Sequence, residues 1–232
     1  MVYVLAIDNS TKYLSVAYGE CTSKGIKNYN YYHEIHINNA SNNILPKINE
    51  ILNKYDKNIP DYIALGIGPG AFTGVRLASS IAMGLSLAWD IKIVPICSLL
   101  CAVESYRSGH IKHIKTKPDI DFSEQNNRII LDARMNEIYT RTFSYANNKY
   151  SLGNIELLNI NYEFISVEQN STSKNNIILT DIENYKYEHD FTTPHALGLL
   201  SLMYNNLDFA CFPHQIQPNY IRNKVQVLLQ KE

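Results

Sequence analysis

Polar residues follow the first predicted strand, and their types could hold a charged ligand. The apolar run over residues 2–7 ends at Asp8, and Ser10 and Thr11 come directly after it. A carboxylate with two hydroxyls at the end of a strand can bind a phosphate or a magnesium-bound water. The same residue types also form turns whose side chains bond their own backbone, and this is the simpler interpretation. Asp8, Ser10 and Thr11 are therefore candidates for nucleotide binding, with the turn as the alternative.

A glycine-rich stretch over residues 65–77, LGIGPGAFTGVRL, predicts a strand, a tight turn and the start of a helix. Its glycines allow a turn that bulkier residues would prevent, and Thr73 is a suitable helix N-cap. Backbone amides at such a helix start can face an anion. The stretch is no P-loop, because Gly74 is followed by a valine and Arg76 where a P-loop has lysine and then serine or threonine.

The predicted helix over residues 74–89 carries small residues in two rows. One row is Gly74, Ala78, Ala82 and Ser86, and the neighbouring row is Ser80, Gly84 and Ala88. A glycine inside a helix costs about 1 kcal/mol relative to alanine, so Gly84 indicates that something packs closely against it. The rows alone favour close helix packing over an anion cradle, and packing within the domain over packing against another subunit.

Two further polar groups have ordinary structural explanations. The charged turn within residues 132–139 could be braced by a buried ion pair of Arg134 with Glu137 or Asp132. His110 and His113 lie among the lysines of residues 112–117 and predict a solvated basic loop. An RNA contact is the alternative for this loop, whereas a metal site would need additional ligands that nothing nearby supplies.

Composition excludes several classes of protein. The 232 residues suffice for one large domain or two ordinary ones. A net charge of −1 argues against holding nucleic acid by bulk electrostatics. Four cysteines without a CxxC pair, and a chain that begins directly in a predicted strand, indicate reduced thiols in the cytoplasm. No apolar run approaches the roughly 20 residues of a membrane-spanning helix.

Hydrophobic patterning divides the chain into two units of mixed α/β structure. Three strands, a helix over residues 42–55, a strand, the helix after the glycine turn, and a further strand and helix fill the first half. Residues 108–127 are polar and predict a loop or domain junction. Strands near residues 128–134 and 137–145, weaker strand candidates near 149–158 and 177–180, and a helix from Pro194 to Tyr204 follow.

Four motifs together resemble one family. Residues 6–11 (AIDNST), 68–77 (GPGAFTGVRL), 132–139 (DARMNEIY) and 219–223 (NYIRN) occur in the order seen in the TsaB (YeaZ) family of bacterial tRNA threonylcarbamoyladenosine biosynthesis proteins. The resemblance implies an α/β, actin-like and sugar-kinase-like (ASKHA) fold with two lobes and mixed sheets flanked by helices. By analogy, residues 1–107 with 212–232 form the first lobe, and residues 108–211 form the second.

The resemblance also implies a role. Members of this family look like non-catalytic relatives of TsaD, the subunit that transfers the threonylcarbamoyl group to adenosine beside the anticodon. TsaD-like enzymes carry a metal-binding histidine motif where this chain has residues 95–104, PICSLLCAVE, which include no histidine. The implied partners are TsaD in a heterodimer, the ATPase TsaE, a second copy of the chain when it is alone, and tRNA only through the complex. ATP or ADP and a metal would be held by partner subunits, with no cofactor of the chain's own.

In the family, helices around the glycine stretch form the surface that meets TsaD. The resemblance therefore implies that the two helices of residues 42–55 and 73–88 form an interface with a partner, instead of packing only within the domain. The implied partner-binding residues are Leu45, Ile48, Leu52, Thr73, Gly74, Leu77, Ala78, Ile81, Ala82 and Leu85. The rival function is a free-standing ATPase or sugar-kinase-like enzyme that uses Asp8, Thr11 and the glycine turn. A glycoprotease (M22-like) peptidase is a more remote alternative.

Overall fold

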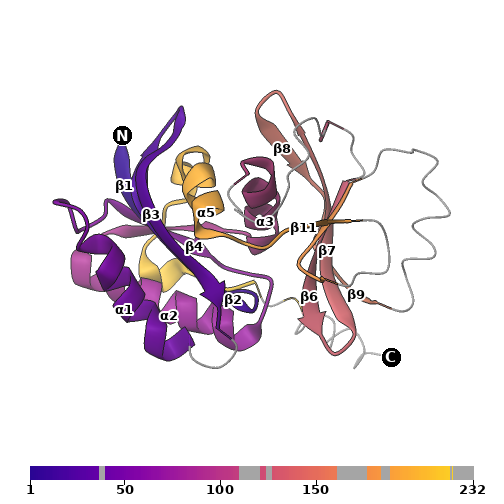
Figure 1. Ribbon diagram of the computed structural model, residues 1–232, viewed down its shortest axis with the longest axis horizontal. Coiled ribbons are helices and arrows are strands. Elements are labelled where there is room, and N and C mark those ends of the chain that lie inside the picture. Colours follow the sequence, from indigo (N-terminus) through magenta and orange to yellow (C-terminus); the bar gives the residue numbers. More distant parts are fainter. Residues whose placement is uncertain are drawn as a thin grey trace.

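The computed structural model describes residues 1–36, 40–109, 121–123, 127–160, 177–183, 189–219 and 221. Two sheets lie side by side, and among the described residues several helices cover the first sheet while one helix lies between the two (Figure 1). The basic loop with His110 and His113 lies outside the described residues, as does most of the motif over residues 219–223.

The first sheet has five strands in the order β3-β2-β1-β4-β5. Its strands are β1 (Val2–Asp8), β2 (Tyr13–Thr22), β3 (Gly25–Ile35), β4 (Tyr62–Gly66) and β5 (Lys92–Ile96). β1, β2 and β3 pair antiparallel, whereas β4 and β5 continue the sheet parallel to β1. The parallel strands are connected through helices, as parallel pairing requires.

Helices cover both faces of this sheet. α1 (Ala40–Leu52) and α2 (Phe72–Trp89) pack on the face that receives Leu5 and Ile7 of β1. α5 (Ala196–Met203) packs on the opposite face, against Val4 and Ala6. The alternation follows from the two-residue period of a strand. The strand therefore carries an apolar core on each side.

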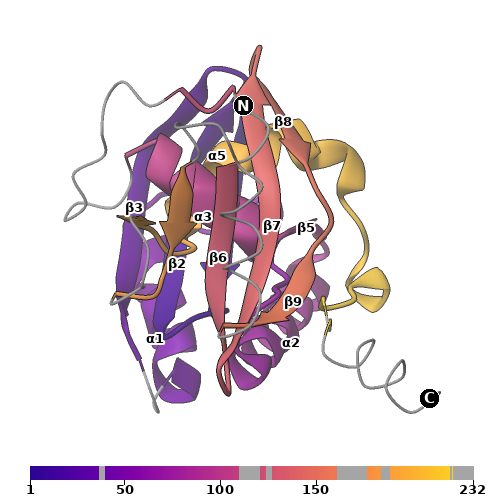
Figure 2. The ribbon, with the colours of Figure 1, turned by 90° about the vertical axis from the view of Figure 1, so that its right-hand side faces the viewer.

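The second sheet has the order β11-β10-β6-β7-β8, with β9 also paired to β7, and Figure 2 shows it in front. Its strands are β6 (Asn127–Arg134), β7 (Glu137–Ala146), β8 (Lys149–Leu152), β9 (Glu156–Asn159), β10 (Ile178–Thr180) and β11 (Asp190–Phe191). α3 (Ser98–Arg107) lies between the two sheets (Figure 1). Its Cys101 joins the core of the first sheet, and its Leu99 and Val103 join the core of the second.

A buried polar network also joins the lobes. Glu104 of α3 is 3% exposed and accepts hydrogen bonds from Nη2 of Arg107 at 2.8 Å and from the hydroxyl of Ser108 at 2.5 Å. The hydroxyl of Tyr150 in β8 donates to the same carboxylate. Burial of a carboxylate is tolerated when its oxygens are paired in this way. The network fixes α3 against the hairpin of β7 and β8.

The return to the first lobe is predicted at residue 212, and α5 already packs on the first sheet before that point. α5 and the following 3₁₀ helix η1 (Tyr204–Phe209) already belong to the first lobe, and Cys211 bridges Ile93 of β5, before η2 (Pro213–Gln215). The reason is that α5 is apolar nearly all round and needs burial on more than one side. A Cβ at Gly198 would lie 2.4 Å from Oγ of Ser105, so α5 also packs closely on α3.

No helix in the part of the chain that the structure describes is both long and apolar enough to span a membrane.

Candidate functional site

Asp8 ends β1 and is enclosed by hydrogen bonds. Its Oδ1 accepts from the amide of Ser10 at 2.8 Å and from its hydroxyl at 2.7 Å, and its Oδ2 accepts from the hydroxyl of Ser98 at 2.8 Å. The residue is 1% exposed. Burial raises the pKa of this carboxyl, and the hydrogen bonds from Ser10 and Ser98 oppose that rise. Oδ2 therefore connects the end of β1 to the first turn of α3, whereas Oδ1 holds the turn that follows β1.

In β4, the strand beside Asp8, position 66 has room only for a glycine. A Cβ at Gly66 in β4 would lie 1.8 Å from Oδ2 of Asp8. Ser98 in turn accepts a hydrogen bond from the amide of Gly68 at 3.0 Å, and its own amide donates to the Gly68 carbonyl at 2.9 Å. Asp8 is thus part of the packing that sets the path of the glycine-rich stretch.

The glycine turn packs against the turn between β1 and β2. The amide of Ala71 donates to the carbonyl of Ser10 at 2.6 Å. A Cβ at Gly70 would lie 2.2 Å from that same oxygen, and one at Gly74 would lie 1.9 Å from the carbonyl oxygen of Asn9. These glycines are needed because two backbone segments approach closely. Close packing alone accounts for both of them.

The predicted N-cap at Thr73 is wrong. α2 begins at Phe72, its N-cap is Ala71, and no side chain caps it. Alanine is a poor N-cap because it offers no acceptor. The amide of Ala71 donates to the carbonyl of Ser10, and the N-cap lies two residues before Thr73. Ala71 therefore offers the first turn of α2 no side-chain acceptor.

The two rows of small residues on α2 face opposite directions. Ala78 and Ala82 are completely buried, and Ser86 is 1% exposed, within the core of the first lobe. Gly84 in the other row is exposed, and a Cβ added there would meet nothing within 4 Å. Internal packing, predicted for the rows, is therefore confirmed for one row only. The close neighbour expected at Gly84 is not part of the described chain.

The predicted partner-binding set needs a correction. Ile48 and Leu52 of α1 and Ala78 and Ala82 of α2 lie in the core of this chain. In the chain by itself these four side chains are covered by its own core. Six predicted residues keep some exposure, and they are Leu45, Thr73, Gly74, Leu77, Ile81 and Leu85. Sequence spacing shows which residues share a helix face, but it does not say which face points inward.

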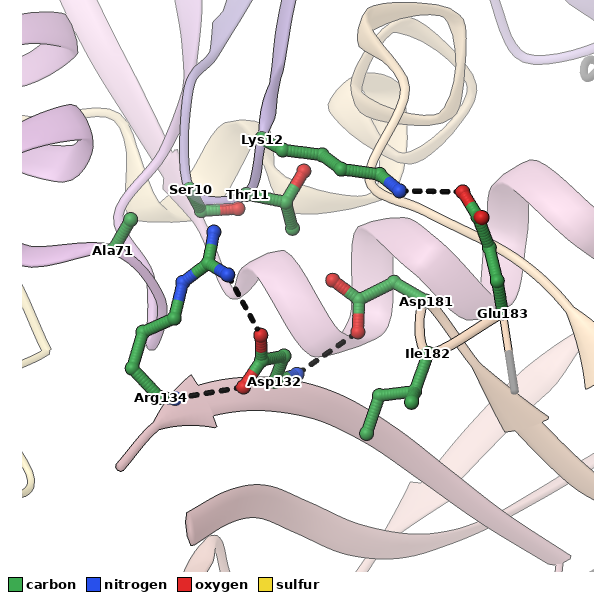
Figure 3. Close-up of a pocket in the computed structure, with 9 residues that line it drawn as sticks. All are labelled: Ser10, Thr11, Lys12, Ala71, Asp132, Arg134, Asp181, Ile182 and Glu183. Atoms are coloured by element: carbon green, nitrogen blue, oxygen red, sulfur yellow. Dashed lines mark hydrogen bonds and ion pairs between the residues drawn. The ribbon is translucent and has the colours of Figure 1, made fainter. Parts of the chain in front are cut away.

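A cleft of about 250 Å³ lies between the lobes, and Figure 3 shows its lining. Thr11 and Lys12 enter it from the first lobe, and Asp132, Asp181 and Glu183 enter it from the second. Nζ of Lys12 lies 2.5 Å from Oε1 of Glu183, which raises the pKa of the lysine. This ion pair crosses the cleft and connects the two lobes.

Asp181 is the most strongly perturbed acid of the cleft. Burial raises its pKa to about 7, and the charge of Asp132 acts in the same direction, while the Asp132 amide that donates to Oδ1 of Asp181 at 2.9 Å opposes the rise. The predicted ion pair of Arg134 with Asp132 is present at 3.0 Å, but it is not buried, because the Arg134 side chain is 63% exposed. Sequence reasoning missed the role of Lys12, Asp181 and Glu183 in this cleft. Their positions after β1 and β10 are the signal that could have found them.

The three candidates for nucleotide binding divide between these features. Asp8 faces Ser10 and Ser98 in the core, while Ser10 and Thr11 also line the cleft. Oγ1 of Thr11 shares a hydrogen bond of 3.2 Å with Oγ1 of Thr193. Among the described residues, no group of three or more His, Cys, Asp or Glu side chains could hold a metal ion.

Comparison with known proteins identifies proteins that this chain resembles. A model of the family described as TsaD, tRNA N6-adenosine threonylcarbamoyltransferase, matches residues 34–226. The chain is 34% identical over 138 residues to a protein named tRNA threonylcarbamoyladenosine biosynthesis protein TsaB from Haemophilus influenzae, covering 59% of this chain and 51% of the relative. It is 28% identical over 148 residues to the protein of the same name from Escherichia coli, covering 62% and 56%. The alignments thus span about half the length of these curated relatives.

A solved structure named YeaZ, from Pseudomonas aeruginosa, superposes with a TM-score of 0.72 at 23% identity and covers 95% of this chain and 100% of that one. The expected ASKHA-like fold of two mixed sheets flanked by helices is confirmed by this match. The resemblance to the TsaB (YeaZ) family is confirmed as well. Because the matching family model spans residues 34–226 of 232, the chain belongs to the TsaD family, with TsaB proteins among its relatives.

Proposed function

We propose that this chain is a non-catalytic, activating subunit of the machinery that installs threonylcarbamoyl on the adenosine beside the anticodon of tRNA. The names of its relatives support the pathway. The observation that supports a non-catalytic role is the position of Asp8. Its carboxylate, which a phosphotransferase of this fold would need for a metal-bound water or a phosphate, is 1% exposed and bonded on both oxygens by Ser10 and Ser98. The residue serves the fold of the chain.

The proposed partner is TsaD, bound through the outward side of α1 and α2. These helices lie next to each other on the outer face of the first lobe (Figure 1). Leu45 of α1 is 50% exposed, and Ser80 and Gly84 of α2 are exposed. Small residues on a helix surface allow another helix to approach closely, and helices in soluble proteins pack at 8–10 Å when side chains permit. An exposed glycine inside a helix costs about 1 kcal/mol, which a close partner helix would explain.

The remaining components follow from this assignment. The same helix face would bind a second copy of the chain when TsaD is absent, and TsaE would join through the complex. With a net charge of −1, the chain would meet tRNA only through its partners. ATP or ADP and a metal would be held by those partners. We place the chain in the cytoplasm, which its four free thiols fit.

Calorimetric titration with TsaD of the same organism tests the surface. Gly84→Leu adds a large side chain into open space on α2, so the variant should fold as the wild type does, yet lose most of its affinity for TsaD. Ser23→Leu, in the exposed turn between β2 and β3, is the matched control and should bind normally. Unchanged binding by Gly84→Leu would place the partner elsewhere.

The rival, a free-standing ATPase or sugar-kinase-like enzyme, makes a different prediction. It requires ATP turnover by the purified chain that disappears in Asp8→Ala. The enclosed carboxylate argues against this reading, and the non-catalytic proposal predicts no turnover above the background of the preparation.

A further inference from the structure

The tip of the hairpin between β6 and β7 holds a large apolar side chain in solvent. Arg134 and Glu137 pair across the end of the hairpin, so Met135 and Asn136 form a two-residue turn. The φ angles of Met135 and Asn136 are 56° and 61°, as in a type I′ turn. Met135 is 82% exposed, the largest fraction among the large hydrophobic residues that the structure describes. The core of the chain therefore gains no burial from this side chain.

Methionine is also poorly suited to the backbone conformation of this turn. Positive φ is unfavourable for most residues with a Cβ, and glycine, asparagine and aspartate are the residues that tolerate it best. Asn136 fits this preference, whereas Met135 does not. Arg134, just before the turn, also has a positive φ of 66°. Neither core packing nor turn chemistry thus explains a methionine at position 135.

A neighbouring hairpin of the same sheet provides a direct comparison. Ala146 and Lys149 pair across the ends of β7 and β8, so Asn147 and Asn148 form the two-residue turn there. The φ angles of Asn147 and Asn148 are 52° and 59°, close to those at the first tip, and both residues are exposed. Asparagine suits this conformation. The two tips share one turn conformation, but only the first places an apolar residue at its first position.

The first tip lies beside the surface proposed to bind TsaD. Arg134 lines a cleft of about 520 Å³ together with Ser41 of α1 and with Phe72 and Thr73 of α2. Figure 2 shows the tip at the same end of the molecule as α1 and α2. Phe72, at the start of α2, is itself 52% exposed. A partner that covers the starts of these helices is therefore within reach of Met135.

We propose that Met135 is a contact residue for TsaD and inserts into an apolar pocket of that partner. A flexible, polarizable methionine adapts to irregular apolar pockets, and methionine is enriched in protein interfaces. Binding buries a side chain that the lone chain leaves in water, which favours methionine despite the conformation of the turn. The inference rests on the proposed function, and it adds a contact from the second lobe to the helix face of the first.

Reciprocal substitutions at the two tips test the proposal by thermal melts and by calorimetric titration with TsaD. Met135→Asn should raise the Tm by about 2–4 °C, because asparagine suits the turn, and should weaken TsaD binding by at least about tenfold. Asn147→Met, the matched change at the other tip, should lower the Tm by a similar amount and leave TsaD binding unchanged. Met135→Leu keeps an apolar side chain of similar volume and should bind within about threefold of the wild type.

Each other outcome counts against a different claim. Wild-type affinity in Met135→Asn, or an equal loss of affinity in Asn147→Met, would overturn the role of Met135, while the effect of Gly84→Leu would still test the helix face. A lower Tm in Met135→Asn would show that the methionine serves the fold of the lone chain. A wild-type chain that does not bind TsaD would overturn the proposed function and this inference together.

Sedimentation velocity of the chain without TsaD tests a second copy as the occupant. If Met135→Asn weakens self-association and leaves TsaD binding intact, the tip contacts another copy of the chain and its assignment to TsaD is wrong. Loss of TsaD binding with unchanged self-association is the result that the proposal predicts.

Discussion

Two glycines of α2 should respond to the same substitution with opposite signs. Gly74 lies in the first turn, where an added Cβ would be 1.9 Å from the carbonyl oxygen of Asn9. Gly84 lies in the middle of the helix, where an added Cβ meets nothing within 4 Å. Both substitutions to alanine remove the same backbone freedom from the unfolded chain. The comparison therefore isolates the contact between α2 and the turn that follows β1.

The magnitudes follow from this geometry. Gly84→Ala should raise the free energy of unfolding by about 1 kcal/mol, the helix-propensity difference. In Gly74→Ala that gain is opposed by a clash with a backbone atom that no rotamer change can relieve. Overpacking costs about 1–3 kcal/mol, occasionally more, and the contact here is at the severe end. The net effect of Gly74→Ala should be a loss of about 2 kcal/mol, so the two variants should differ by about 3 kcal/mol.

Urea unfolding at neutral pH measures both changes, and thermal melts provide a second reading. For a chain of this size, 1 kcal/mol corresponds to a Tm shift of about 2–4 °C. The Tm of Gly84→Ala should therefore rise by about that amount, while that of Gly74→Ala should fall by about twice as much. Equal stabilisation of both variants would refute the claim that the glycine turn is fixed by the turn after β1.

Three further substitutions test the buried polar groups. Folding raises the pKa of Asp181 to about 7. The wild type should therefore lose stability relative to Asp181→Asn as the pH rises from about 4 to about 8. A stability difference from urea unfolding that does not change with pH would contradict this expectation. Tyr150→Phe removes a donor to the buried Glu104 and should cost about 1.5–3 kcal/mol; a melt like that of the wild type would show that the network is dispensable. Ser98→Ala removes the donor to Asp8 and should cost about 2–4 kcal/mol in urea unfolding, and a loss below the error of the method would dismiss that hydrogen bond.

Periodicity predicted most of the first lobe. The apolar run of residues 2–7 and the helical spacing in residues 42–55 depend on local chemistry, and β1 and α1 lie close to where they were expected. The position of α5 in the first lobe was not predictable in the same way. Its apolar surface shows that it is buried, but not which of two sheets buries it.

Contacts between distant parts of the chain form the candidate sites, and sequence patterns did not predict these contacts. Lys12 and Glu183 are 171 residues apart in the chain and form their ion pair only because the two lobes are placed side by side. No local pattern carries that information. The burial of Ala78 and the exposure of Gly84 likewise depend on which side of α2 meets the sheet. Both rows of small residues have the same spacing, so the sequence alone could not separate them.

Reconstitution of tRNA modification tests the central claim most directly. TsaD and TsaE of the same organism would receive threonylcarbamoyl adenylate and tRNA, with and without this chain, and modified adenosine would be measured. A non-catalytic activating subunit predicts that modification requires the chain, that the chain alone transfers nothing, and that Gly84→Leu fails to support the reaction. Modification at full rate without the chain would contradict the account.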